Sequence, residues 1–226
     1  MTTLTTAPVS RKRSAAFPEP DRDVEQRFVI GAVSWASYQD IARALTGRHV
    51  RLTFDRGSLE FMTISGKHGK LSRLIGQLIA ALADELGIPR GQYGDMTCDN
   101  ESAMRGLEPD ECFYLTNEPL VRGKDDIDLT VDPPPDLAVE VDLSPSQRDR
   151  LSVYAALGIP EVWRYDGSIL AVHQLDKSGS YVEATSSRYF PAIPIAGIAA
   201  FIDRRLQLDE ASLLRSFREW VASSTK

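Results

Sequence analysis

Residues 136–143 constrain the fold more than any other segment, because charged and apolar side chains alternate along them. Successive side chains of a β-strand point to opposite faces of the sheet. One face of the predicted strand is wholly apolar and consists of Leu137, Val139, Val141 and Leu143. The other face carries three carboxylates, those of Asp136, Glu140 and Asp142. Neighbouring carboxylates repel one another unless water, an arginine or another cation lies between them.

This acidic face has two interpretations. A divalent-metal site would suit it, because Mg²⁺ prefers hard oxygen ligands and is held by one or two protein carboxylates together with waters. A strand face open to solvent is the plainer alternative, and it is the commoner meaning of a D-x-x-x-E pattern taken alone. Asp136, which follows Pro135, also suits a residue that caps the start of the strand.

The length and composition of the chain are typical of a single folded domain. Its 226 residues suffice for one substantial domain, which we expect to span residues 28–226. Residues 1–27 are expected to form a disordered arm, because they begin with a Thr-, Ser-, Ala- and Pro-rich stretch that lacks the apolar core of a secretion signal. No apolar run approaches the about 18 residues that cross a membrane, and Cys98 and Cys112 lack metal-ligand spacing. A cytoplasmic protein without a membrane partner is therefore expected.

The formal net charge of −6 limits how the chain could bind DNA. A protein whose whole surface contacts DNA is usually basic, because phosphate contacts supply much of the affinity. Any DNA-binding surface must therefore be local or be completed by a second subunit. Residues 122–124, Arg-Gly-Lys, are the best candidate for a DNA-facing loop, with an ordinary surface loop as the alternative. An acidic chain is still compatible with a nuclease, whose metal site must itself be acidic.

Hydrophobic periodicity predicts a mixed order of helices and strands. Helices are expected over residues 35–45, 67–86, 145–157, 195–201 and 208–221. Strands are expected over residues 28–33, 49–54, 58–64, 92–98, 111–116, 136–143, 161–166, 168–175 and 181–184. Ser34 and Ser144 suit the N-caps of two helices, and Pro145 suits the first position of the second one. Turns at residues 55–57 and 166–167 predict two β-hairpins.

Several blocks of the chain resemble the Uma2 family of putative restriction endonucleases. The most specific are residues 135–141 (Pro-Asp-Leu-Ala-Val-Glu-Val), residues 144–146 (Ser-Pro-Ser) and residues 154–166 (Tyr-Ala-Ala-Leu-Gly-Ile-Pro-Glu-Val-Trp-Arg-Tyr-Asp). Pro109-Asp110 and the segment 66–69 around His68 are similar as well, so the resemblance covers roughly residues 28–205. The family in turn resembles the PD-(D/E)XK nuclease superfamily. This implies a mixed α/β, restriction-endonuclease-like fold with a central mixed sheet flanked by helices.

The resemblance also implies a site and a chemistry. Asp110 is similar to the aspartate of the "PD" motif, and Glu140 is similar to the acidic residue on the next strand. Both would ligate Mg²⁺ or Mn²⁺, with the backbone carbonyl of Val141 as a further ligand. A metal at such a site lowers the pKa of an attacking water and neutralises charge on the phosphate. DNA is the implied substrate, and a homodimer would let two sites meet the two strands.

The chain departs from the superfamily pattern in one important respect. The position two residues after Glu140 holds Asp142 instead of lysine, and Arg150 occupies the place on the following helix where this family usually has lysine. Arginine can stabilise developing charge, but its very high pKa makes it a poor proton acceptor. A catalytically weakened binding module that retains the nuclease fold is therefore the alternative to an endonuclease. A hydrolase of small phosphate esters or nucleotides is a third possibility.

Some residues have both a functional and a structural interpretation. Glu60 corresponds loosely to another acidic residue of the family, and His68 could orient a phosphate or simply begin a helix. Asp142 could be a second metal ligand or the partner of Arg148 or Arg150. The aromatic residues of the matching blocks are expected in the core, namely Tyr154, Trp163 and Tyr165. Lys67 and Lys70 are expected to be solvated.

Overall fold

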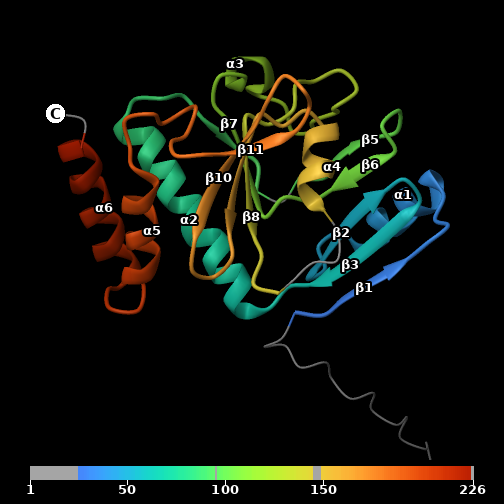
Figure 1. Cartoon of the computed structure of the whole chain (residues 1–226), viewed down its shortest axis with the longest axis horizontal. Coiled ribbons are helices and arrows are strands. Elements are labelled where there is room, and N and C mark those ends of the chain that lie inside the picture. The colour runs from blue at the N-terminus through green and yellow to red at the C-terminus, as the bar shows by residue number, and fades with distance from the viewer. Residues whose placement is uncertain (1–24, 95, 145–148, 225–226) are drawn as a thin grey trace, which may run out of the picture.

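Helices and strands alternate along the residues that the computed structural model describes, which are 25–94, 96–144 and 149–224 (Figure 1). The helices are α1 (Trp35–Leu45), α2 (Gly66–Glu85), α3 (Glu118–Val121), α4 (Arg150–Ala156), α5 (Ile195–Arg204) and α6 (Glu210–Ser224). The strands are β1 (Arg27–Ile30), β2 (Val50–Asp55), β3 (Ser58–Thr63), β4 (Gly91–Gln92), β5 (Cys98–Asn100), β6 (Arg105–Leu107), β7 (Glu111–Tyr114), β8 (Leu137–Val141), β9 (Glu161–Tyr165), β10 (Leu170–Leu175) and β11 (Tyr181–Ala184).

The strands form two sheets. A six-stranded sheet has the order β11-β10-β9-β8-β7-β4 and is mixed, because β8 and β9 are parallel whereas their other neighbours are antiparallel. Two parallel strands need a crossover connection, and α4 lies in this connection. A five-stranded antiparallel sheet has the order β1-β3-β2-β6-β5. The mixed α/β class that the sequence predicts is thereby confirmed, with a second sheet beside the mixed one.

Helices cover the mixed sheet in layers. The helix α2 packs against β7 and β8, α5 packs against both β10 and α2, and α6 packs against α2 and α5 (Figure 1). Ser65 caps α2, because its side chain accepts a hydrogen bond from the His68 backbone N–H. The buried positions Leu71, Ile75, Leu78 and Leu82 follow the helical period and enter the core. On the other side of the sheet, α4 contacts β6 and β2 of the five-stranded sheet.

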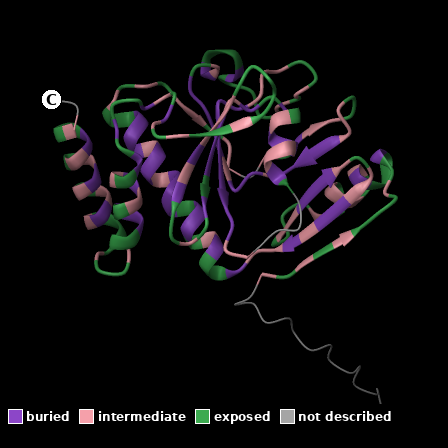
Figure 2. Ribbon diagram, viewed as in Figure 1, coloured by how far each residue is buried: buried purple, intermediate pink, exposed green. Residues whose placement is uncertain are grey.

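Strand β8 lies between these layers and is buried along its whole length (Figure 2). Its residues Leu137, Val139 and Val141 belong to the core beneath α2. Ala138 instead packs with Val153 and Tyr154 of α4. The alternation predicted from the sequence is therefore confirmed, and it directs Glu140 toward the junction of the two sheets and α4.

Several local predictions are confirmed. The side chain of Ser34 caps α1 by accepting a hydrogen bond from the Ser37 N–H. Residues 56 and 57 both have positive φ, as the tight turn between the hairpin strands β2 and β3 requires. The aromatic side chains expected in the core are buried, namely Tyr154, Trp163 and Tyr165. Among the described helices, none combines the length and the apolar character needed to cross a membrane.

Other local predictions are wrong. A single strand over residues 92–98 does not form, since β4 and β5 at its two ends belong to different sheets. The strand β6 was not predicted, because its three residues are too few to show a period. Asp149, and not Ser144, caps α4 by accepting a hydrogen bond from the Ser152 N–H. The Ser144 hydroxyl instead contacts Glu25 and Arg27.

Two predictions fall partly outside the described residues. Pro145, which is predicted at the first position of a helix, lies outside the described residues. Of the arm predicted over residues 1–27, the structure describes only residues 25–27, and Arg27 is the first residue of β1.

Candidate active site

Two buried carboxylates come from neighbouring parts of the mixed sheet. Glu140 lies on β8, and Asp110 immediately precedes β7, whose register with β8 begins at the pair Glu111 and Val139. The Asp110 backbone N–H donates to the Val139 carbonyl at 3.1 Å, and the Val141 N–H donates to Asp110 Oδ2 at 2.7 Å. Asp110 and Glu140 are 5% and 3% exposed. Burial raises the pKa of Glu140 and the Asp110 charge adds to this effect, so the two acidic groups are close enough to interact inside the protein.

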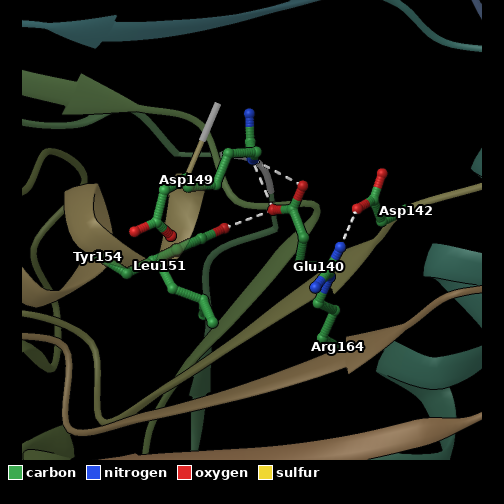
Figure 3. A pocket seen from close by; sticks show the side chains of 7 residues that line it. Glu140, Asp142, Asp149, Leu151, Tyr154 and Arg164 are labelled. Atoms are coloured by element: carbon green, nitrogen blue, oxygen red, sulfur yellow. Dashed lines mark hydrogen bonds and ion pairs between the residues drawn. The ribbon is translucent and has the colours of Figure 1, made fainter. Parts of the chain in front are cut away.

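Arg150 and Tyr154 of α4 bind Glu140. They lie one helical turn apart and therefore share a face of the helix. Arg150 Nη2 donates to Glu140 Oε2 at 2.9 Å, and the Tyr154 hydroxyl donates to the same oxygen at 2.7 Å (Figure 3). Arg150 Nε lies 2.7 Å from Glu140 Oε1, without hydrogen-bond geometry. Arg150 also donates to Thr53 Oγ1 and to the Glu108 carbonyl, which ties α4 to the five-stranded sheet.

The electrostatics of Glu140 are dominated by burial. Burial raises the pKa of Glu140, and the negative charge of Asp110 acts in the same direction, although the Arg150 charge and the hydrogen bonds from Arg150 and Tyr154 oppose both. Burial lowers the pKa of Arg150, but the charges of Glu140, Tyr154 and Asp110 and the hydrogen bond to Glu140 together outweigh it and raise the pKa. The ionised form of the buried Glu140 therefore depends on a neighbouring cation, and Arg150 supplies this charge.

His68 connects Asp110 with a residue close to β1. Its Nε2 lies 2.7 Å from Asp110 Oδ1, and its Nδ1 lies 2.7 Å from Glu25 Oε1. Burial alone would lower the pKa of His68, but the hydrogen bonds and charges of Asp110 and Glu25 outweigh it and raise the pKa to about 9. Burial likewise opposes ionisation of Asp110, yet His68 and the Val141 N–H lower the pKa of Asp110 below its ordinary value. His68 is therefore an imidazolium held between two carboxylates.

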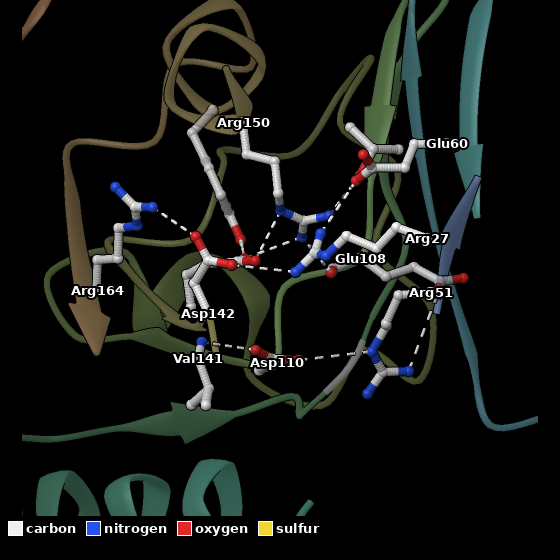
Figure 4. Close-up of polar contacts among 12 residues, drawn as sticks. Arg27, Arg51, Glu60, Glu108, Asp110, Val141, Asp142, Arg150 and Arg164 are labelled. Atoms are coloured by element: carbon white, nitrogen blue, oxygen red, sulfur yellow. Dashed lines mark hydrogen bonds and ion pairs between the residues drawn. The ribbon is translucent and has the colours of Figure 1, made fainter. Parts of the chain in front are cut away.

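Glu60 and Asp142 are joined by an arginine from β1. Arg27 Nη1 lies 3.1 Å from Glu60 Oε1, and Arg27 Nη2 lies 3.1 Å from Asp142 Oδ1 (Figure 4). Arg164 contacts the other oxygen of Asp142. The arginines beside Asp142 are thus Arg27 and Arg164, and the predicted pairing of Asp142 with Arg150 is wrong. Position 148, the other predicted partner, lies outside the described residues.

The structure brings the predicted site residues together at the junction of the two sheets: Figures 3 and 4 show all of them except His68, which contacts Asp110. A family model described as "putative restriction endonuclease", Uma2, matches residues 35–195. The chain belongs to the Uma2 family. No curated protein sequence matches the chain. The description of this family supports a nuclease-like function.

The Uma2 match includes every site residue predicted from the sequence, which are Glu60, His68, Asp110, Glu140, Val141, Asp142 and Arg150. It excludes Glu25 and Arg27, which the sequence did not reveal as site residues. Both lie at the end of the predicted arm, and their partners are far away along the chain. Arg51 was also missed, although it lies 3.8 Å from Asp110 Oδ1 and 3.9 Å from Glu108 Oε2. The one signal in the sequence for Arg51 as a site residue was its place on the predicted strand that forms a hairpin with the strand of Glu60.

The donor atoms of this Uma2 site fit a divalent metal of the Mg²⁺ type. Asp110 and Glu140 offer hard carboxylate oxygens, and the buried Glu140 Oε1 has no hydrogen-bond partner. A cavity of about 180 Å³ borders Glu140, Asp142 and Arg150. Within the described part of the chain, no group of three or more His, Cys, Asp or Glu side chains forms a metal-binding cluster. A metal would therefore need waters and a backbone carbonyl beside these two carboxylates, as Mg²⁺ usually does.

Asp136 lies apart from this site. Its Oδ2 accepts hydrogen bonds from the backbone N–H groups of Leu115 and Asn117, at 2.7 and 2.8 Å. These contacts fit the interpretation in which Asp136 caps the start of the strand. The candidate DNA-facing loop also has local partners, because Arg122 pairs with Glu118 and Lys124 with Asp132.

Replacing Asp136 with alanine is expected to lower the free energy of unfolding by about 2 kcal/mol, because two buried backbone donors lose their acceptor. Urea denaturation measures this loss. Asp136→Asn keeps an acceptor oxygen and should lose less. An alanine variant as stable as the wild type would show that water replaces the carboxylate without penalty.

The His68 imidazolium is expected to make stability depend on pH. Its pKa rises from 6.5 to about 9 on folding, and at about 1.4 kcal/mol per pKa unit this contributes about 3 kcal/mol. Because the pKa in the folded state is the higher one, the contribution is fully present below pH 6.5 and is lost as the pH rises through about 9. Urea denaturation across this range, without metal, measures it. His68→Phe should flatten the profile, whereas His49→Phe, at an exposed histidine, should not. An unchanged profile in His68→Phe would contradict this assignment.

Proposed function

We propose that this Uma2 protein is a Mg²⁺- or Mn²⁺-dependent endonuclease that hydrolyses phosphodiester bonds of DNA. The observation that supports this most is the burial of two interacting carboxylates, Asp110 just before β7 and Glu140 on the neighbouring β8. Burial of two adjacent carboxylates is unfavourable unless cations compensate them. A hydrolase that must hold a metal provides a functional reason for such a pair.

Each residue has a distinct part in this proposal. A bound divalent metal lowers the pKa of the attacking water and neutralises the charge that grows on the phosphate. Asp110 and Glu140 hold the metal, with the backbone carbonyl of Val141 as a further ligand. The Val141 N–H and His68 fix the orientation of the Asp110 carboxylate. Arg150 supplies positive charge to the transition state but does not accept a proton.

Glu60 and Asp142 have a supporting part. They hold the guanidinium of Arg27 close to the site, and this arginine also contacts Ser144. Cutting both strands of a duplex needs two such sites, so the proposal includes a homodimer.

A second candidate function is a binding module that keeps the fold without efficient cleavage. It is favoured by the contacts of Arg150, whose guanidinium already neutralises Glu140 and also binds Thr53 and the Glu108 carbonyl. A metal at Glu140 would have to share this carboxylate with Arg150 or displace it. The two functions differ in one measurable respect, which is turnover in the presence of metal.

The test of the proposal is a cleavage assay on supercoiled and single-stranded DNA with Mg²⁺, Mn²⁺ or EDTA, beside calorimetric titration of the metal. The endonuclease should bind the metal and nick or linearise DNA only when it is present. Metal binding without cleavage would favour the binding module. Hydrolysis of free nucleotides but not of DNA would favour the third possibility, a hydrolase of small phosphate esters.

A further inference from the structure

A second cavity has Asp110, but not Glu140, in its lining. Its volume is about 330 Å³, close to the lower end of the range of about 300–1,000 Å³ that ligand pockets have. The turn before β2, strand β2 itself, helix α2 and the segment after β4 all contribute to its wall. The side chains that matter for its charge are Arg48, His49, Arg51, Arg73, Asp110 and Glu111.

The lining of this cavity is positive overall, because Arg48, Arg51, Arg73 and the His68 imidazolium outnumber the two acidic groups. The guanidinium groups of Arg48 and Arg73 are on exposed residues and make no hydrogen bond or ion pair with any residue in the described ranges. Of the two acidic groups, Asp110 is compensated by the His68 imidazolium, and Glu111 accepts a hydrogen bond from Gln92 at 2.9 Å. Two guanidinium groups without partners among the described residues line the same cavity, one from the turn before β2 and one from α2, and indicate a site for an anion.

The shape of the cavity suits a phosphate. Gly47 and Gly94 border it, and a Cβ atom added at either glycine would meet nothing within 4 Å. The ligand could therefore approach the backbone there without meeting a side chain. Guanidinium forks match the oxygens of a phosphate in pairs, which makes arginine the preferred residue for binding it.

We infer that this cavity binds a backbone phosphate of the nucleic acid, with Arg48 and Arg73 as its ligands, next to the phosphate that the Asp110–Glu140 site would cleave. The inference rests on the proposed function for the choice of DNA as the source of the phosphate. It explains how a chain with a net charge of −6 can bind a polyanion, because the positive charge is local. Asp110 lies in the wall of this cavity and Glu140 in the wall of the other, so the two cavities flank the carboxylate pair.

The experiment measures the affinity of a fluorescein-labelled DNA duplex by anisotropy in Ca²⁺ at several salt concentrations. The variant is Arg48→Ala/Arg73→Ala. Its matched control is Lys67→Ala/Lys70→Ala, which removes the same charge from exposed positions of α2 that do not line this cavity. Each lost phosphate contact should reduce the slope of log K against log salt by about one. We therefore expect the arginine variant to lose about two in this slope and about tenfold or more in affinity, and the lysine control to change little.

Cleavage of the same duplex in Mn²⁺ separates the possible failures. If the wild type binds and cuts, but the arginine variant has the affinity and slope of the lysine control, the cavity inference is overturned and the nuclease proposal stands. If the arginine variant loses affinity and slope while the wild type does not cut the duplex in Mn²⁺, the cavity inference stands and the nuclease proposal falls. If the wild type binds inorganic phosphate or a mononucleotide but not DNA, both are overturned. Thermal unfolding of both variants verifies that these surface substitutions leave the fold intact.

Discussion

Replacing Asp110 with asparagine is expected to lower metal-dependent DNA cleavage by about a thousandfold or more. Asparagine has nearly the same shape and can still accept the hydrogen bond from the Val141 N–H. It lacks the negative charge and one of the two hard oxygens that a divalent metal requires. Cleavage rates on supercoiled DNA in Mn²⁺ and calorimetric metal binding measure the two consequences, and both should be lost together.

Asp136→Asn provides the matched control for this experiment. It makes the same chemical change at a buried aspartate that precedes the neighbouring strand β8, but its carboxylate binds the Leu115 and Asn117 N–H groups outside the site. The control should cut DNA at the wild-type rate. If Asp110→Asn retains cleavage and metal binding, Asp110 is no metal ligand. The buried pair would then need another explanation.

The central part of the site could be predicted from the sequence because it depends on local geometry. The alternation along residues 136–143 directs Glu140 away from the apolar face of β8, and this requires only that the segment be a strand. The aspartate on the neighbouring strand, Asp110, was placed by the family resemblance. The long apolar stripe of α2 was equally predictable, because its period continues over five turns.

The charged surroundings of the site could not be predicted in the same way. Arg27 contacts Asp142 across 115 residues of chain, and Glu25 contacts His68 across 43. No local pattern encodes such partners, since they depend on how β1 joins the edge of the five-stranded sheet. The short strands β4, β5 and β6 were mispredicted or missed for a related reason. Two or three residues show no period, and pairing with neighbouring strands alone defines them.

These surroundings change how the metal site should be understood. Six carboxylates, those of Glu25, Glu60, Glu108, Asp110, Glu140 and Asp142, lie among the side chains of Arg27, Arg51, His68, Arg150 and Arg164. The cluster is therefore almost neutral without any metal. A nuclease of this kind would bind its metal in exchange for contacts that arginines make in its absence. Arg150 is the residue at which this exchange can be measured.

Replacing Arg150 with methionine is expected to lower the free energy of unfolding by about 3–5 kcal/mol, because a buried carboxylate loses its cation. Arg150 and Glu140 are both nearly inaccessible to solvent, and Thr53 and the Glu108 carbonyl lose the same donor. Urea denaturation without metal measures the loss. Arg150→Lys keeps the charge without the planar fork and should lose less. The double variant Glu140→Gln/Arg150→Met removes both charges and should recover much of the stability.

Metal dependence then separates the two proposed functions. A ligand that binds only the folded state stabilises it in proportion to the logarithm of its concentration over its Kd. If Asp110 and Glu140 hold a metal, Mg²⁺ should stabilise Arg150→Met more than the wild type, because the metal no longer competes with the guanidinium. The double variant should gain little from Mg²⁺. If Arg150→Met is destabilised and Mg²⁺ does not rescue it, Arg150 is a structural cation in a binding module. If Arg150→Met unfolds like the wild type, the buried ion pair has been assigned wrongly.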